Sequence, residues 1–146
     1  MRLEKLLSLQ NRNWRKSLEA FVDSLRMHYG KVTIILFGSR ARGDYSASSD
    51  TDLLIILERS TWDDLKLILD LAYKCGVASP EPHVFSIDFV VRNFENNTLL
   101  LDAVYEGKVL VDEFNIIETL RKRLEIVLKK LKKTRKGWLK RDEAPS

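Results

Sequence analysis

The strongest constraint on the fold is a pair of aspartates at the entrance to a short apolar run. Asp50 and Asp52 precede residues 53–57, Leu-Leu-Ile-Ile-Leu. That run is too short for a buried helix and is typical of a strand covered on both faces. Residues two apart in a strand point to the same face. The pattern therefore predicts two carboxylates on one face, at the start of a central strand.

A third aspartate interrupts a second apolar run. Asp88 lies within residues 84–91, Val-Phe-Ser-Ile-Asp-Phe-Val-Val, whose β-branched and aromatic content is typical of a strand. Neighbouring strands lie about 4.8 Å apart. If these two strands are neighbours, Asp50, Asp52 and Asp88 converge on one small volume. The alternative for the first pair alone is plain turn and capping chemistry, which also uses aspartate.

Three buried carboxylates need a positive partner. Neither apolar run contains Arg or Lys, and carboxylates that are close together raise one another's pKa. A divalent cation is the natural compensator, and oxygen ligands select Mg²⁺, or alternatively Mn²⁺. Two such ions about 3.5–4 Å apart would hold both oxygens of an in-line displacement. The three aspartates are therefore the candidate catalytic and metal-binding residues.

A glycine–serine turn precedes the aspartates. Residues 32–37, Val-Thr-Ile-Ile-Leu-Phe, predict a buried strand that ends at Gly38 and Ser39. Glycine permits a tight turn and a close approach of backbone to ligand, and free N–H groups at a helix start favour an anion. Arg40 and Arg42 add guanidinium groups, which suit phosphate oxygens. Gly38, Ser39, Arg40 and Arg42 are therefore the candidate phosphate-binding residues.

The segment Gly38-Ser39-x-Ala41-Arg42-Gly43, followed by Ser49-Asp50-x-Asp52-Leu53-Leu54, resembles the signature of the minimal nucleotidyltransferases. These belong to the DNA polymerase β-like nucleotidyltransferase superfamily, and the match extends over residues 32–111. The resemblance implies that the turn contacts a triphosphate, with support from Arg42. It also implies that Asp50 and Asp52 bind metal and that Asp88 helps to deprotonate an attacking hydroxyl. The implied reaction moves a nucleoside monophosphate, AMP in the favoured case, from ATP or another nucleoside triphosphate.

The resemblance leaves the acceptor open. Members of the group act as the antitoxin of a toxin–antitoxin pair, adding AMP to a tyrosine of a helical HEPN-type toxin. Others modify small molecules or RNA ends. The chain has 146 residues and no obvious second domain to hold a small acceptor. That favours a protein partner of the HEPN type or an RNA acceptor.

The predicted architecture is an α/β sandwich of the polymerase β-like type. Helices are expected over 3–29, from Ser60 to Gly76 and over 96–106, with strands at 32–37, 51–58, 84–91 and 108–111. They would form a small mixed sheet with helices on one face and the active site on the other. Residues 1–112 would form the nucleotidyltransferase domain. His28 and His83 are isolated in the sequence and predict packing or surface roles.

Residues 113–146 predict a basic amphipathic helix with a short polar tail. Residues 121–146 hold 11 of the 25 basic and 3 of the 21 acidic residues, so this segment carries +8 and the rest −4. The helix could pack on its own domain, form a homodimer or bind a partner. Trp138 is a candidate for stacking on a base. A rival function is thus a non-catalytic module that binds a partner or RNA through this helix.

Cysteine content and hydropathy predict a cytoplasmic protein. The single cysteine, Cys75, cannot form an internal disulfide, which fits a reducing compartment. The first residues lack the apolar stretch of a signal peptide. No apolar run approaches the 18 or so residues of a membrane span, so no membrane association is expected.

Overall fold

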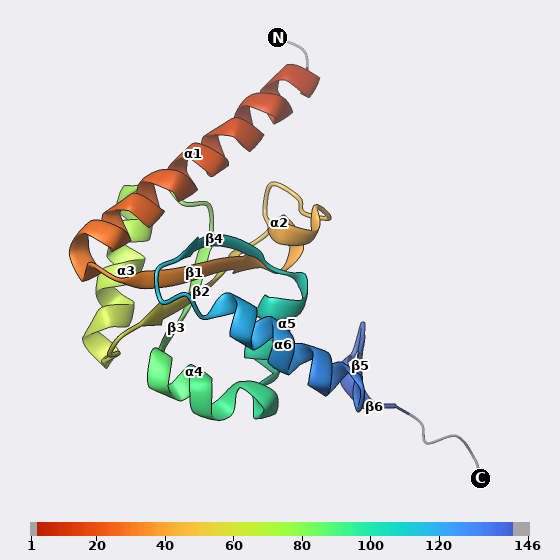
Figure 1. Cartoon of the computed structure of the whole chain (residues 1–146). Coiled ribbons are helices and arrows are strands. Elements are labelled where there is room, and N and C mark those ends of the chain that lie inside the picture. Colours follow the sequence, from red (N-terminus) through yellow and green to blue (C-terminus); the bar gives the residue numbers. More distant parts are fainter. Residues whose placement is uncertain (1–2, 142–146) are drawn as a thin grey trace.

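The computed structural model describes residues 3–141, with side chains from residue 13 onward. Five helices and four strands make up the main body, and one further helix and a hairpin follow (Figure 1). The elements are α1 (Leu3–Tyr29), β1 (Val32–Phe37), α2 (Ser39–Arg42), β2 (Thr51–Leu57), α3 (Trp62–Lys74), β3 (Pro80–Ser86), α4 (Ile87–Asn93), the 3₁₀ turn η1 (Phe94–Asn96), α5 (Thr98–Glu106), β4 (Lys108–Asp112), α6 (Ile117–Leu128), β5 (Leu131–Thr134) and β6 (Gly137–Lys140).

The first helix agrees with the prediction for residues 3–29. It is unbroken, and the chain turns after it at Gly30, whose φ of 76° favours glycine. Over residues 3–141, no helix combines the length and the apolarity needed to cross a membrane.

A four-stranded mixed sheet forms the centre of the fold, in the order β3-β2-β1-β4. β1 pairs antiparallel with both β2 and β4, and β2 pairs parallel with β3. The register sets Asp52 opposite Phe37 on one side and opposite Glu81 on the other. This register brings the ends of three strands together around Asp52.

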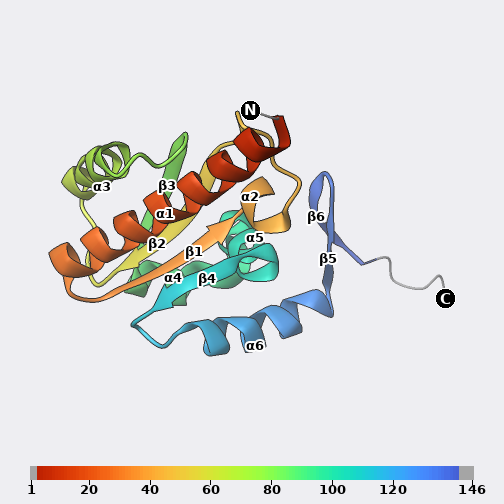
Figure 2. The same cartoon turned by 90° about the horizontal axis from the view of Figure 1, so that it is seen from above.

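Helices cover both faces of the sheet, whereas the sequence predicted helices on one face. One core packs α1 and α3 against alternate residues of β1 and β2, including Ile34 and Ile55. The other packs α4, α5 and α6 against the intervening residues, including Ile35 and Leu54. Figures 1 and 2 show α1 across one side of the strands and α5 on the opposite side. Strands with an uninterrupted apolar run bury both faces, and therefore need two helical layers.

The strand predicted over residues 84–91 is wrong in extent. β3 begins earlier, at Pro80, and ends at Ser86, where α4 starts. The Ser86 hydroxyl accepts a hydrogen bond of 3.1 Å from the amide of Phe89, which is the capping bond of a helix start. This local capping signal outweighs the strand propensity of the β-branched residues that follow.

The C-terminal segment is also different from the predicted continuous helix. α6 ends at Leu128, and β5 and β6 form a hairpin that stands apart from the main sheet (Figure 2). α6 packs into the second core through Leu120, Leu124 and Val127. Trp138, the candidate for stacking on a base, is half-buried, and its indole N–H donates to Asp102 at 2.8 Å. The predicted tail from 142 onward lies outside the described residues.

Candidate active site

Two aspartates lie where β2 begins, as the sequence predicted. Asp52 is the second residue of β2, and Asp50 is exposed in the loop just before it. The hydroxyl of Ser79 donates a 2.7 Å hydrogen bond to Asp50 Oδ1. Ser79 immediately precedes β3. The backbone N–H of Thr51, the first residue of β2, donates a hydrogen bond to the carbonyl of Ser79 and so links the starts of the two strands. The two strand starts therefore position Asp50 jointly.

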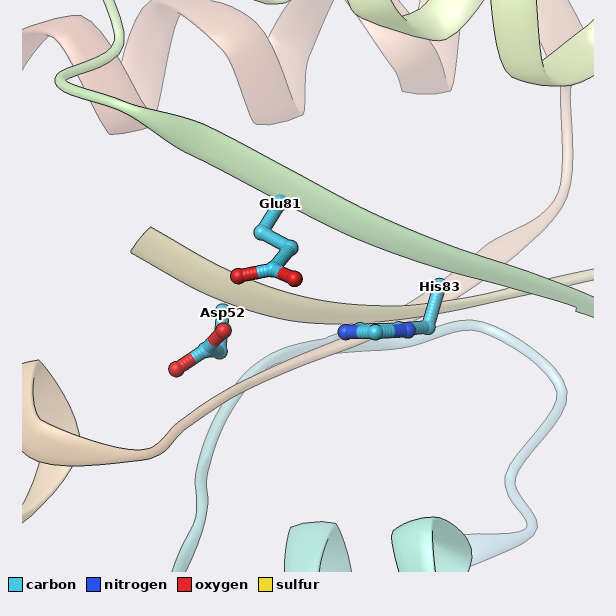
Figure 3. A group of neighbouring side chains, drawn as sticks. All are labelled: Asp52, Glu81 and His83. Carbon is cyan, nitrogen blue, oxygen red and sulfur yellow. The ribbon is translucent and has the colours of Figure 1, made fainter. Parts of the chain in front are cut away.

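The third carboxylate of this cluster is Glu81, which sequence reasoning missed. Glu81 lies directly beside Asp52 in the parallel pairing of β2 and β3. Its carboxylate and that of Asp52 form a group with the imidazole of His83, with the ligand atoms of all three within 4.8 Å of one another. Figure 3 shows the three side chains directed toward the same space, from two adjacent strands.

Asp88 does not occupy the position predicted for it. It lies in the first turn of α4, is exposed, and pairs with Arg92 at 3.1 Å. β3 runs from the Glu81 end of the site to Ser86, five residues away, which is about 16 Å along an extended strand. Asp88 follows Ser86, and so belongs to the opposite end of the strand from Asp52.

The two histidines differ in position. His83 is half-buried, two residues after Glu81 on the same face of β3, and its ring packs 5.7 Å from that of Phe37. Burial lowers the pKa of His83, and the nearby charge of Glu81 opposes this in part. His28 is exposed near the end of α1 and contacts Tyr29. The packing or surface roles predicted for the two histidines therefore omit the position of His83 beside the carboxylates of Asp52 and Glu81.

Burial raises the pKa of Asp52, and the negative charges of Asp50 and Glu106 raise it further. A hydrogen bond with Glu81 and the charge of Arg42 oppose that shift without reversing it. The pKa of Glu81 is also raised, by burial first and then by its contacts with Asp50 and Asp52. The cluster concentrates negative charge, which a bound cation would neutralise.

The residues present fit a divalent cation. The cluster offers carboxylate oxygens from Asp52 and Glu81, and Asp50 contacts Glu81; carboxylate oxygens are the ligands that Mg²⁺ and Mn²⁺ accept. Gly38 keeps one side of Asp52 clear, because a Cβ at that position would lie 2.2 Å from Asp52 Oδ2. A residue larger than glycine would therefore displace the carboxylate.

The glycine–serine turn lies against this cluster. Gly38 follows β1 with φ 74° and ψ −158°, a conformation that is essentially restricted to glycine, and Ser39 begins α2. The Gly38 amide donates to Glu106 Oε1 at 3.2 Å, and Arg42 Nη1 donates to the same carboxylate at 3.0 Å. Glu106 thus occupies the anion position at the turn that the sequence assigned to phosphate.

Arg40 lies elsewhere than the sequence predicted. Its side chain is buried, and its guanidinium lies 5.2 Å from the ring centroids of both Trp14 and Tyr45. Its Nη2 donates to the carbonyl of Ser49, next to Asp50. Arg40 therefore supports the loop that carries Asp50, whereas Arg42 is exposed beside the cluster.

Two of the missed residues had a signal in the sequence. Glu81 and His83 alternate with prolines 80 and 82 in the order Pro-Glu-Pro-His, and two prolines so close together indicate a loop. β3 is an edge strand, where proline is tolerated. The alternation of Glu81, His83 and Phe85 on one face would have identified them. Glu106 had no such signal, because its role depends on where α5 ends in space.

Comparison with known proteins identifies the class that this fold and site define. The family model described as Polymerase beta, Nucleotidyltransferase matches residues 22–116, well over half of the chain. The chain belongs to this nucleotidyltransferase family. The matched range contains the glycine–serine turn, the three carboxylates of the cluster and His83.

Two relatives come from Methanocaldococcus jannaschii, and both are provisionally named protein adenylyltransferases. The first is 42% identical over 64 residues, which are 42% of this chain and 60% of that protein. The second is 29% identical over 128 residues, covering 79% of this chain and 83% of that protein. The chain thus spans less than two thirds of the first relative and most of the second.

Solved structures share the fold. A toxin–antitoxin complex crystallised with AMP-PNP contains a chain that superposes with a TM-score of 0.56 at 20% identity, covering 76% of this chain and 86% of its own. A mutant of the toxin–antitoxin pair MntA–HpeT gives a TM-score of 0.52 at 18% identity, covering 74% and 83%. At these identities the likeness establishes the polymerase β-like fold.

Proposed function

We propose that this protein is a nucleotidyltransferase that moves AMP from ATP onto a hydroxyl group of a partner protein. The observation that carries the proposal is the convergence of Asp50, Asp52 and Glu81 beside the turn at Gly38 and Ser39. Three carboxylates next to a turn with close backbone access suit a reaction that brings a polyanionic triphosphate against metal-binding side chains.

In this proposal the residues of the chain divide the work. Gly38, Ser39 and Arg42 would hold the β- and γ-phosphates, and Asp50, Asp52 and Glu81 would hold two divalent cations, Mg²⁺ or Mn²⁺. When bound, these cations neutralise phosphate charge and lower the pKa of the acceptor hydroxyl.

The transfer forms one bond and breaks another. The acceptor oxygen bonds to the α-phosphorus, and the bond from that phosphorus to the oxygen bridging to the β-phosphate breaks, releasing pyrophosphate. Glu81 takes the acceptor proton, which is the role that the sequence had assigned to Asp88. Glu81 is suited to this role by its place beside Asp52 at the start of the neighbouring strand.

The names of the relatives support a protein as the acceptor. Both Methanocaldococcus jannaschii proteins are named for adenylyl transfer to protein, and the chain of similar fold crystallised with AMP-PNP comes from a toxin–antitoxin pair. We therefore propose that this chain is the antitoxin of such a pair and acts in the cytoplasm. Its acceptor would be a tyrosine of a helical toxin of the HEPN type.

A second candidate function is non-catalytic: residues 113–146 would bind a partner protein or RNA. The observation in its favour is a set of exposed cations on α6 and the hairpin: Arg121, Lys122, Lys129, Lys130, Lys132, Arg135, Lys136, Lys140 and Arg141. Such a surface could neutralise several phosphates, and its RNA affinity would then fall steeply with salt. Weak or salt-independent RNA binding would leave a protein partner as the occupant.

The decisive experiment compares two acidic variants in one labelling assay. Purified protein is incubated with α-labelled ATP, a divalent cation and the product of an adjacent gene. Glu81→Gln should lower labelling by two or more orders of magnitude. The change removes a carboxylate whose charge would help to hold the cation and whose oxygen would accept the proton. Asp88→Asn, which removes a carboxylate beyond the far end of β3, should retain labelling.

The reverse result, with Asp88→Asn inactive and Glu81→Gln active, would refute this assignment. Asp50→Ala/Asp52→Ala serves as the inactive reference. Parallel reactions with CTP, GTP and UTP identify the nucleotide that is transferred. Reactions with lysate offer other acceptors, and a labelled RNA band would identify RNA ends as the acceptor in place of a protein.

A further inference from the structure

We propose that the imidazole of His83 is a direct ligand of the cation held by Asp52 and Glu81, and that it makes this site bind Mn²⁺ in preference to Mg²⁺. The inference deepens the proposed function, because it concerns the same carboxylate site. It concerns metal binding alone, however, and can be tested without nucleotide or acceptor.

The position of His83 is the first support. β3 is extended, so that Glu81 and His83 point to the same face. Their ligand atoms and that of Asp52 all lie within 4.8 Å of one another. Two ligands on opposite sides of one ion at about 2.2 Å are about 4.4 Å apart. Adjacent ligands of such an ion are about 3 Å apart, so side-chain movements of about 1–2 Å would bring all three onto a single ion.

The orientation of the ring is the second support. Figure 3 shows the imidazole extending along the strand toward the two carboxylates, and not away from them. Phe37 packs against the ring at 5.7 Å and limits its movement. Phe37 is the β1 residue opposite Asp52, so that the packing contact and the carboxylate belong to the same row of the sheet.

The absence of other partners is the third support. Among the side chains of residues 13–141, none forms a hydrogen bond or an ion pair with His83. The ring nitrogens of His83 are not among the buried unpaired atoms of these side chains, so an ion can reach them. One ring nitrogen lies within 4.8 Å of a carboxylate oxygen of Asp52 and of Glu81, whose negative charge a cation would neutralise.

The chemistry follows from the ligand types. A site made of carboxylates suits Mg²⁺, which binds nitrogen poorly and prefers oxygen in a near-octahedral set. Imidazole nitrogen favours first-row transition ions over Mg²⁺, and Mn²⁺ is the first-row ion that shares with Mg²⁺ a preference for carboxylate and water oxygens. Replacing one oxygen by the His83 nitrogen therefore shifts the preference of the site toward Mn²⁺.

The test measures metal binding directly. Mn²⁺ is titrated into nucleotide-free protein, and free Mn²⁺ is followed by electron paramagnetic resonance, with Mg²⁺ as competitor. His83→Gln, which keeps the size of the side chain, should weaken Mn²⁺ binding about tenfold or more and change Mg²⁺ binding by less than about twofold. His28→Gln changes the other histidine, away from the cluster, and should match the wild type.

Nitrogen coupling gives a second readout that does not depend on a variant. Pulsed electron paramagnetic resonance of bound Mn²⁺ should show ¹⁴N modulation in the wild type and in His28→Gln, and should lose it in His83→Gln. Absence of ¹⁴N modulation in the wild type would overturn the inference even if His83→Gln failed to fold. Equal losses of Mn²⁺ and Mg²⁺ binding in folded His83→Gln would also overturn it, by assigning a structural role.

The outcomes separate this inference from the proposed reaction. His83-dependent Mn²⁺ binding without AMP transfer to any acceptor would support the metal ligand and count against the transferase. AMP transfer with Mn²⁺ binding that is independent of His83 would support the transferase and refute the ligand.

Discussion

Gly38 offers a direct test of how closely the turn and the Asp52 carboxylate are packed. In Gly38→Ala the new methyl group would lie 2.2 Å from Asp52 Oδ2, whereas real Cβ contacts are essentially never shorter than 3.0 Å. The Asp52 carboxylate would have to move by about 1 Å. A misplacement of that size at a reacting centre costs about 10²-fold in rate.

The backbone adds a separate cost. At φ 74° and ψ −158°, alanine is strained by about 1–3 kcal/mol relative to glycine. For a chain of 146 residues, each kcal/mol lowers Tm by about 2–4 °C. Gly38→Ala should therefore melt at a temperature about 2–12 °C below the wild type, and it should bind Mg²⁺ or Mn²⁺ more weakly as well.

Gly43→Ala is the matched control. Gly43 also has a positive φ, of 90°, but a Cβ there meets nothing within 4 Å. Alanine in this left-handed conformation costs about 1–2 kcal/mol, so that its melting temperature should fall while cation binding stays unchanged. Differential scanning calorimetry and cation titration distinguish the two variants. If Gly38→Ala binds cations and transfers nucleotide as well as Gly43→Ala does, the proposed contact between turn and carboxylate is refuted.

Two further predictions concern contacts beside and away from the cluster. Glu106→Gln removes the negative charge beside the amide of Gly38 and the guanidinium of Arg42. ATP binding should become severalfold tighter, because the Glu106 carboxylate no longer competes with phosphate for these donors. Weaker ATP binding in an equilibrium titration would show that Glu106 serves to anchor the turn instead. Tyr29→Phe removes the 2.7 Å bond from the tyrosine hydroxyl to Asp64 and should cost about 1 kcal/mol at neutral pH. Burial raises the pKa of Asp64, but the hydrogen bonds from Thr61 and Tyr29 outweigh burial, so the net shift lowers this pKa. The stability linked to the Asp64 carboxylate is therefore present above its unfolded pKa, which is near 4. That stability is lost as the pH falls through the pKa of the folded state. The stability difference between Tyr29→Phe and the wild type should therefore shrink in urea titrations below about pH 4, and a difference that is constant with pH would contradict the reasoning.

The helix at the start of the chain, the first two strands and the turn between them agree with the prediction from sequence. Residues 32–37 and 53–57 are apolar throughout, and such runs form buried strands in almost any tertiary context. Asp52 follows from the same pattern, because its position at the start of β2 is a local matter of spacing. Those parts of the site could be predicted from the residues themselves.

The stretch from Pro80 to Val91 could not. Its prolines indicate a loop and its β-branched residues a strand, yet the structure has an edge strand followed by a helix. The prolines are tolerated because β3 has a neighbour on one side only, and the helix starts because Ser86 caps it. The C-terminal segment differs for a similar reason, since Asp102 of α5 accepts bonds from Lys133 and Trp138 and so holds the hairpin against the main body.

The sequence by itself determined the central strands, the glycine–serine turn and the pair of aspartates, because each depends on contacts between residues that are close along the chain. Tertiary structure decided the third carboxylate. The parallel register of β2 and β3 joins residues 29 positions apart, and it sets Glu81 beside Asp52 while leaving Asp88 at the far end of the strand. The tertiary structure also places the guanidinium of Arg40 over the ring of Trp14 and brings the carboxylate of Glu106 to the amide of Gly38. Such pairings depend on the register between strands and on where helices end in space, which local patterns do not specify.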